Sequence, residues 1–163
     1  MAEEQAAGTN QEQPQQQFAL QRIYTKEISL ESPATPAIFK KQWQPQINVD
    51  LGTKSDKIDE TGNFEVVLTI TITAKVEGET AFLVEVQQAG IFFITGFEAE
   101  DLRRIMGTAA PNDLFPYARE CIDNLCVKGG FPPVMRAPIN FDAMYQQALA
   151  QAQAAPAAEP ATH

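Results

Sequence analysis

The segment from Phe64 to Val76 constrains the fold more than any other part of the sequence, because apolar and polar residues alternate along it. A period of two is typical of a strand with one buried face. The residues expected to face inward are Phe64, Val66, Leu68, Ile70, Ile72 and Val76, and those expected to face outward are Glu65, Thr69, Thr71, Thr73 and Lys75. Glu77-Gly78-Glu79 predicts a tight hairpin turn. The chain should therefore return as an antiparallel strand.

The return strand is expected to run from Thr80 to about Phe97, with a bulge or bend at Gly90. Its alternation directs one set of side chains inward and the other outward. The inward set is Phe82, Val84 and Val86, and the outward set is Leu83, Glu85 and Gln87. One face of this hairpin therefore needs a covering layer.

Two further strands precede the hairpin. The first is expected over Phe18–Leu30, with Phe18, Leu20, Tyr24, Ile28 and Leu30 on the inward face, and the second over Gln46–Leu51. A proline-bounded crossover from Pro33 to Pro45 joins them, and a polar stretch from Lys54 to Asn63 leads to the hairpin.

Helical periodicity replaces alternation after the fourth strand. A short helix is expected over Glu98–Met106, and a longer one is expected to begin at Asn112 or Asp113, with Pro116 in its first turn, and to end at Gly129. Asn140 should cap a last helix. Four strands followed by helices predict an α+β fold, a four-stranded antiparallel sheet with helices packed on one face. The domain should span residues 18–150, between disordered tails at 1–17 and 151–163.

The charge balance excludes several classes of protein. Among 163 residues the formal net charge is −9, and the few basic residues are scattered, so nucleic-acid binding is not expected. No stretch approaches the roughly 18 apolar residues of a membrane span, and the N-terminus does not resemble a secretory signal. We therefore expect a cytoplasmic protein without direct membrane insertion.

The inventory of reactive residues argues against catalysis. The single histidine is the terminal His163, so a histidine base or histidine-ligated metal is not expected. Cys121 and Cys126 are spaced as structural thiols rather than as a metal or redox pair. Neither a Walker loop nor a G-x-G-x-x-G motif occurs, so no nucleotide or other cofactor is expected. A small-molecule enzyme that uses paired carboxylates stays open as a rival.

Two sets of residues need a functional explanation beside a structural one. Aromatic and methionine side chains occur in the crossover and in the last helix, namely Phe39, Trp43, Phe141, Met144 and Tyr145. They could simply fill the core, or they could line a groove that binds unfolded chains through apolar contacts and unpaired backbone.

The second set is acidic. Glu27 and Glu31 should share the outer face of the first strand, about 13 Å apart, and Glu85 should share the outer face of the fourth strand with Leu83. This is either an ordinary solvated face or a docking surface for a basic partner, with Leu83 as its apolar contact.

Several stretches resemble the signature sequences of the SecB family of bacterial protein-export chaperones, in order and from about Phe18 to Leu149. They are Gln21-Arg22-Ile23-Tyr24-Thr25-Lys26, Trp43-Gln44-Pro45, Phe64-Glu65-Val66-Val67-Leu68, Thr80-Ala81-Phe82-Leu83-Val84-Glu85-Val86-Gln87-Gln88, Leu114-Phe115-Pro116-Tyr117-Ala118-Arg119-Glu120 and Ala137-Pro138-Ile139-Asn140-Phe141-Asp142. Several blocks of five or more residues in order are far more specific than one short motif.

This resemblance implies a homotetramer, a dimer of dimers, that binds unfolded preproteins without using nucleotide and delivers them to the SecA motor for export. It also implies that Glu27, Glu31, Leu83 and Glu85 form the SecA-docking face and that the client groove lies near Trp43, Phe141 and Tyr145. The C-terminal tail departs from the family pattern, since it is rich in Ala, Gln and Pro with one acid, Glu159. A SecB-like chaperone dedicated to another client, such as an antitoxin, is the alternative function.

Overall fold

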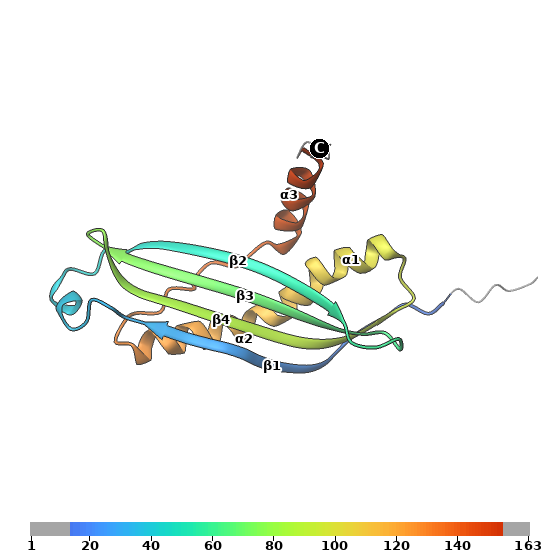
Figure 1. Cartoon of the computed structure of the whole chain (residues 1–163), viewed down its shortest axis with the longest axis horizontal. Coiled ribbons are helices and arrows are strands. Elements are labelled where there is room, and N and C mark those ends of the chain that lie inside the picture. Colours follow the sequence, from blue (N-terminus) through green and yellow to red (C-terminus); the bar gives the residue numbers. More distant parts are fainter. Residues whose placement is uncertain (1–13, 155–163) are drawn as a thin grey trace, which may run out of the picture.

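The computed structural model describes residues 14–154, in which one sheet is covered on one side by helices (Figure 1). The elements in chain order are β1 (Gln17–Glu31), a 3-10 helix (Ala37–Lys40), β2 (Gln46–Lys57), β3 (Asn63–Val76), β4 (Glu79–Thr95), α1 (Ala99–Gly107), α2 (Ala109–Lys128) and α3 (Phe141–Ala154). All strand pairs are antiparallel, in the order β1-β4-β3-β2. The predicted fold class is confirmed.

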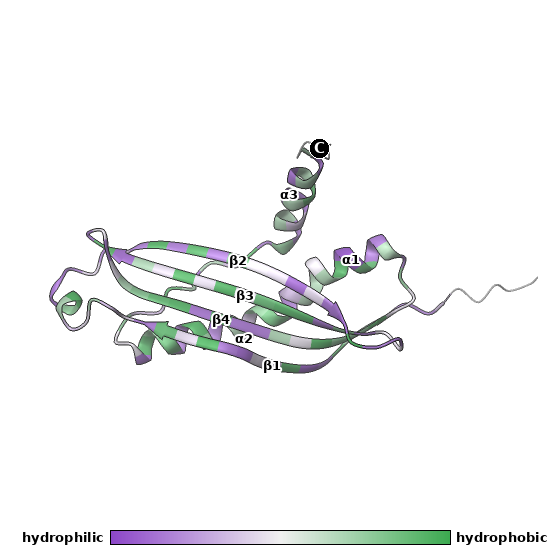
Figure 2. Cartoon of the chain, in the orientation of Figure 1, coloured by the Kyte–Doolittle hydropathy of each residue, from purple (hydrophilic) through white to green (hydrophobic). Residues whose placement is uncertain are grey.

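The core lies between the sheet and α2. Most helix-facing residues of β3 and β4 are buried, among them Leu68, Ile72 and Phe82, and Leu114 and Ile122 of α2 pack against them. Hydrophobic and hydrophilic residues alternate along the strands, as Figure 2 shows. This alternation leaves one sheet face for the core and the other for solvent.

Gly90 marks a close approach of two elements, and the predicted bulge at this position is wrong. It pairs in register with Val66 and Ile23. A Cβ atom at Gly90 would lie 2.9 Å from Leu114 Cδ2. Without a Cβ at this position, Leu114 of α2 packs directly against the sheet, and a larger residue would force that side chain to shift. From Phe82 to Ile94, the even-numbered residues of β4 share this side and face the helix, whereas the odd-numbered residues face the other side of the sheet.

The register shifts of β1 fall at two other places, between Leu20 and Arg22 and between Thr25 and Glu27. Each inserts one extra residue and reverses which side chains face the core. Tyr24 consequently points to the solvent face, where it hydrogen-bonds Glu65, and Ile23 pairs with Gly90 on the helix side. The expectation that Tyr24 faces inward is therefore wrong, because it assumed unbroken alternation.

Several element boundaries also differ from the sequence prediction. β2 continues to Lys57 rather than Leu51, because its polar half still pairs with β3. α2 begins at Ala109, so that Pro116 lies inside the helix and not in its first turn. α3 continues to Ala154, past the expected boundary at 150. The outer parts of both predicted tails, including His163, lie outside the described residues.

The ends of α2 and α3 follow the predicted capping chemistry. At the end of α2, the Gly130 amide donates to Val127 O and the Phe131 amide to Cys126 O, with Gly130 at a φ of 86°. This is the Schellman pattern, which favours glycine at the left-handed position. At the start of α3, Asn140 Oδ1 accepts the Ala143 amide at 2.9 Å. No helix within residues 14–154 is long and apolar enough to span a membrane.

Candidate binding surfaces

The sheet register brings the four predicted docking residues onto one surface. Glu31 lies opposite Leu83, Ser29 opposite Glu85, and Glu27 opposite Gln87, all on the solvent face of β1 and β4. Glu27 and Glu31 are exposed, whereas Leu83 and Glu85 are half-buried within the sheet. We call Glu27, Glu31, Leu83 and Glu85 the acidic face. Their role in docking stays a prediction.

Asp50 adds a carboxylate that the sequence reasoning did not include. It lies opposite Thr71, which lies opposite Glu85, so β2, β3 and β4 contribute neighbouring residues to one row of the solvent face. The hydroxyl of Thr71 donates to Glu85 Oε2 at 3.2 Å. Alternation with Val49 and Leu51 placed Asp50 on this face, but only the register could show its neighbours.

The predicted groove residues occupy two separate groups. The first, which we call the aromatic cluster, consists of Phe39 and Trp43 from the crossover, Phe82 from β4, and Phe131. Trp43 stacks on Phe82 with ring centroids 6.2 Å apart, and Phe131 lies 5.3 Å from Phe39, 5.5 Å from Trp43 and 4.9 Å from Phe82. Phe82 is fully buried, whereas Phe39 is 52% exposed. The cluster is therefore sealed at its base and open at Phe39.

Phe131 is the residue of this cluster that the sequence reasoning missed. It contacts all three other rings and is itself buried. A usable signal was present, since the residue following the left-handed glycine of a Schellman end often makes an apolar contact.

The second group lies where α3 meets β2. Met144 and Tyr145 are half-buried and line a cavity of about 190 Å³ together with Leu51, Gly107 and Ala148. Phe141 also lines it but is only 4% exposed and packs edge-on against Phe115. Phe141 is thus chiefly a core residue. The assignment of Phe39, Trp43, Phe141, Met144 and Tyr145 to a client groove stays a prediction.

The helix-facing side of β2 connects the two groups. Ile47 and Val49 are 37% and 40% exposed, and they lie between Trp43, three residues before β2, and Leu51 beside α3. β2 is also an edge strand of the sheet. An apolar strip therefore runs along this edge strand, over about 17 Å between residues 46 and 51 at the rise of a strand.

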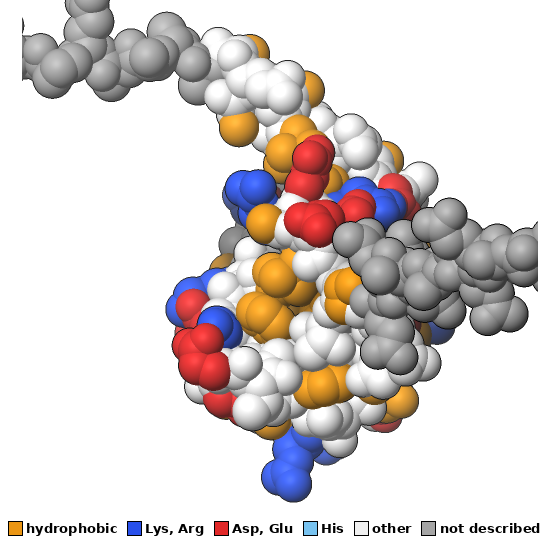
Figure 3. Space-filling view, turned by 90° about the vertical axis from the view of Figure 1, so that its right-hand side faces the viewer, with side chains coloured by type: hydrophobic (Ala, Val, Ile, Leu, Met, Phe, Trp, Pro, Cys, Tyr) orange, Lys and Arg blue, Asp and Glu red, His pale blue; other side chains and the backbone are white. Residues whose placement is uncertain are grey.

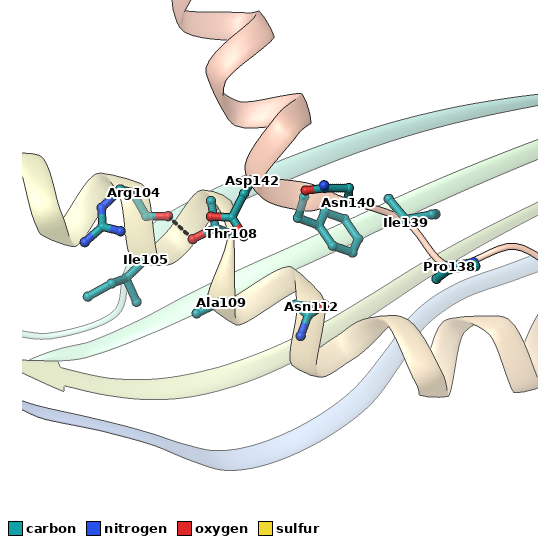
Figure 4. Close-up of a pocket in the computed structure, with 10 residues that line it drawn as sticks. Arg104, Ile105, Thr108, Ala109, Asn112, Pro138, Ile139, Asn140 and Asp142 are labelled. Atoms are coloured by element: carbon teal, nitrogen blue, oxygen red, sulfur yellow. Dashed lines mark hydrogen bonds between the residues drawn. The ribbon is translucent and has the colours of Figure 1, made fainter.

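A larger and more polar depression of about 580 Å³ lies between the α1–α2 junction and the start of α3 (Figure 4). Arg104, Asn112, Asn140 and Asp142 line it, and the Thr108 hydroxyl donates to Arg104 O at 2.7 Å. The end of the molecule that carries α1 shows charges of both signs around exposed hydrophobic side chains (Figure 3). Neither this depression nor this end of the molecule has the uniform negative charge of the acidic face.

Within residues 14–154, no three His, Cys, Asp or Glu side chains are grouped so that they could hold a metal. Burial raises the pKa of Cys126 to about 11, so this thiol stays protonated at neutral pH. Cys121 is only half-buried, and burial raises its pKa too.

Comparison with known proteins gives consistent results. Residues 11–152 match the model of the preprotein translocase subunit SecB. The protein-export protein SecB of Marinobacter nauticus is 52% identical, covering 98% of this chain and 96% of the relative, and that of Hahella chejuensis is 54% identical, covering 94% and 98%.

A solved structure shares the fold. The Mycobacterium tuberculosis Rv1957 SecB-like chaperone, in complex with a ChAD peptide from the Rv1956 HigA1 antitoxin, superposes with a TM-score of 0.62. Its sequence is 16% identical, and the match covers 76% of this chain and 91% of that chain. From the family match and the relatives at about half identity, we conclude that this chain belongs to the SecB family of protein-export chaperones.

Proposed function

We propose that this protein is a cytoplasmic, ATP-independent chaperone that binds unfolded preproteins, keeps them competent for translocation and delivers them to SecA. The observation that carries this proposal is the separation of two surfaces. The acidic face lies on the solvent side of β1 and β4, whereas the apolar strip lies on the helix side of β2. One molecule can therefore hold a client and a motor protein together.

Client binding would use the strip from the aromatic cluster to Tyr145. An extended segment would place apolar side chains on Trp43, Ile47 and Val49, while its backbone pairs with the free edge of β2. Such contacts read little sequence, which suits a chaperone with many clients. Each segment would bind weakly, and assembly as a homotetramer, a dimer of dimers, would supply avidity. Proteins that fold quickly would bury their apolar segments before capture.

Docking to SecA would use the acidic face. Carboxylates around a half-buried leucine favour a partner that carries basic side chains around an apolar contact. Because Glu27 and Glu31 are exposed, the attraction should weaken as salt is added.

The two surfaces are tested by separate variants. Glu27→Lys or Glu85→Lys should weaken SecA binding and leave capture of a reduced, unfolded preprotein largely intact, as measured by calorimetry with each partner. Trp43→Ala combined with Tyr145→Ala should do the reverse. Equal loss of both activities in either variant would indicate a damaged fold and would contradict the assignment of separate surfaces.

A chaperone with one dedicated client is the second candidate. The observation that favours it is the shared fold of the mycobacterial chaperone, which was solved with an antitoxin peptide. Failure of SecA to bind, together with tight binding of one particular protein, would support this candidate. Native mass spectrometry with and without an unfolded preprotein would measure oligomer size and client stoichiometry in the same experiment.

A further inference from the structure

The solvent face of the sheet is divided into two halves of different charge. In one half, the rows of paired residues contain Glu27, Glu31, Glu85 and Asp50 without a basic side chain among them, and Lys75 lies one row beyond them, opposite Gln46 and Thr80. In the other half, the basic residues Arg22, Lys26 and Lys54 lie close to two acids, Glu65 and Asp56. Lys26 is the base closest in sequence to the acidic half.

The β1 bulge turns both Lys26 and Glu27 toward solvent. Thr25 pairs with Gln88 and Glu27 with Gln87, so Lys26 is the extra residue with no partner on β4. Two adjacent residues of a regular strand would point to opposite faces. Here the ammonium of Lys26 and the carboxylate of Glu27 lie on the same face, one residue apart, and Lys26 is thus able to neutralise Glu27.

Glu65 binds the Lys26 ammonium and so draws it away from Glu27. Lys26 Nζ lies 3.0 Å from Glu65 Oε1 and 3.2 Å from Oε2, on β3, across the intervening β4. The Tyr24 hydroxyl donates to the same carboxylate. The Glu65 side chain is 19% exposed, so two donors hold a half-buried carboxylate toward which Lys26 extends.

We propose that Glu65 is a positioning residue of the acidic face, because it holds the Lys26 ammonium over β3 and away from Glu27. This inference rests on the proposed docking of SecA to that face. Without Glu65, Lys26 would be free to pair with Glu27, and the face would present one carboxylate fewer to its partner.

The charge state of Glu65 is suited to this role. The hydrogen bond from Tyr24 and the ammonium of Lys26 hold the pKa of the Glu65 carboxyl below its usual range. Burial and the same hydrogen bond raise the pKa of Tyr24 to about 12. Glu65 is therefore ionised, and Tyr24 protonated, throughout the neutral pH range. The nearby acid Asp56 does not compete strongly for Lys26, because it pairs with Lys54 at 2.9 Å.

The test is a double-variant cycle on the full chain, with SecA affinity measured by calorimetry at low salt. Glu65→Gln should bind SecA about two- to fivefold more weakly, the range that one exposed charge pair supports. Lys26→Met should bind at least as tightly as the unmodified protein. The double variant should recover near-normal affinity, because the freed ammonium is then absent.

A purely structural role for Glu65 would leave the double variant as weak as Glu65→Gln, and that result would overturn the proposal. Unchanged affinity of Glu65→Gln would overturn it as well. Glu60→Gln is the matched control for loss of one negative charge, since Glu60 pairs only with Lys57 in the β2–β3 turn among the described residues. Glu85→Lys, measured alongside, separates failure of the proposed docking function from failure of the role of Glu65. If Glu85→Lys also leaves SecA affinity unchanged, the acidic face does not dock SecA, and the proposed role of Glu65 fails with it.

Discussion

Replacement of Phe131 by alanine should loosen the crossover of this protein and lower its stability. Phe131 is 4% exposed and lies within 5.5 Å, centroid to centroid, of three other rings. Two of those rings, Phe39 and Trp43, belong to the crossover, so Phe131 joins the crossover to the end of α2.

The expected cost follows from burial. A buried Phe→Ala change costs about 3–5 kcal/mol of unfolding free energy, which includes the ring contacts worth about 0.5–1.5 kcal/mol each. Because Trp43 and Phe39 can relax into the space through their exposed sides, we expect the lower end, about 3 kcal/mol. For a chain of 163 residues this lowers the melting temperature by roughly 6–12 °C.

The single tryptophan makes the local effect measurable. Trp43 emission should shift to the red, and its anisotropy should fall, in Phe131→Ala at temperatures where the protein remains folded. Phe18→Ala is the matched control: Phe18 also stacks on a buried ring, Phe92, at 5.5 Å, but it lies on β1 and is 36% exposed. It should cost less and leave the Trp43 spectrum unchanged. An unshifted spectrum in Phe131→Ala, or a loss below about 1 kcal/mol, would refute the reasoning.

Two further predictions concern stability. Gly90→Ala should destabilise the protein by about 1–3 kcal/mol through overpacking against Leu114. Gly52→Ala is the control and should not destabilise it in this way, because a Cβ there meets nothing within 4 Å. Equal melting temperatures of the two variants would contradict this prediction. Hydrogen bonds from the side chains of Asn63 and Thr61 hold the pKa of Asp59 well below its usual range. Its contribution to stability is therefore complete above the pKa of the unfolded chain, about 3.9, and is lost as the pH falls toward the folded value. Asp59→Ala should flatten the acid limb of the stability profile, and an unaltered limb in urea titrations would exclude this role.

The strands and the caps could be predicted because their signals are local. Alternation between Phe64 and Val76 decides which residues can be buried by a strand, and Gly129-Gly130 and Asn140 satisfy helix-end groups within a few residues. The start of α2 was harder to predict, because Pro111 and the Asn112-Asp113 pair are each compatible with a first helical turn. The structure places the start of α2 at Ala109.

The binding surfaces were predictable only in part. The acidic residues were assigned to the correct face, because Glu27, Glu31 and Glu85 each lie next to an apolar residue, Ile28, Leu30 and Val84, that is paired on the helix side of the sheet. The aromatic residues could not be divided into a cluster at Phe131 and a cavity beside α3, since both sets have the composition of a core and of a groove. Their separation depends on where the connector from α2 to α3 runs.

The sequence by itself determined that four strands and three helices would form, which faces of β3 and β4 would be apolar, and which family the blocks resemble. The elements and their apolar faces follow from side-chain periodicity and from capping, which act over a few residues, whereas the family resemblance rests on the matching sequence blocks alone. Tertiary structure decided that Tyr24 and Lys26 reach Glu65, that Gly90 admits α2, and that Phe131 joins the crossover. Such contacts join residues about 24 to 88 positions apart, and they exist only once bulges and packing have fixed the register of the sheet.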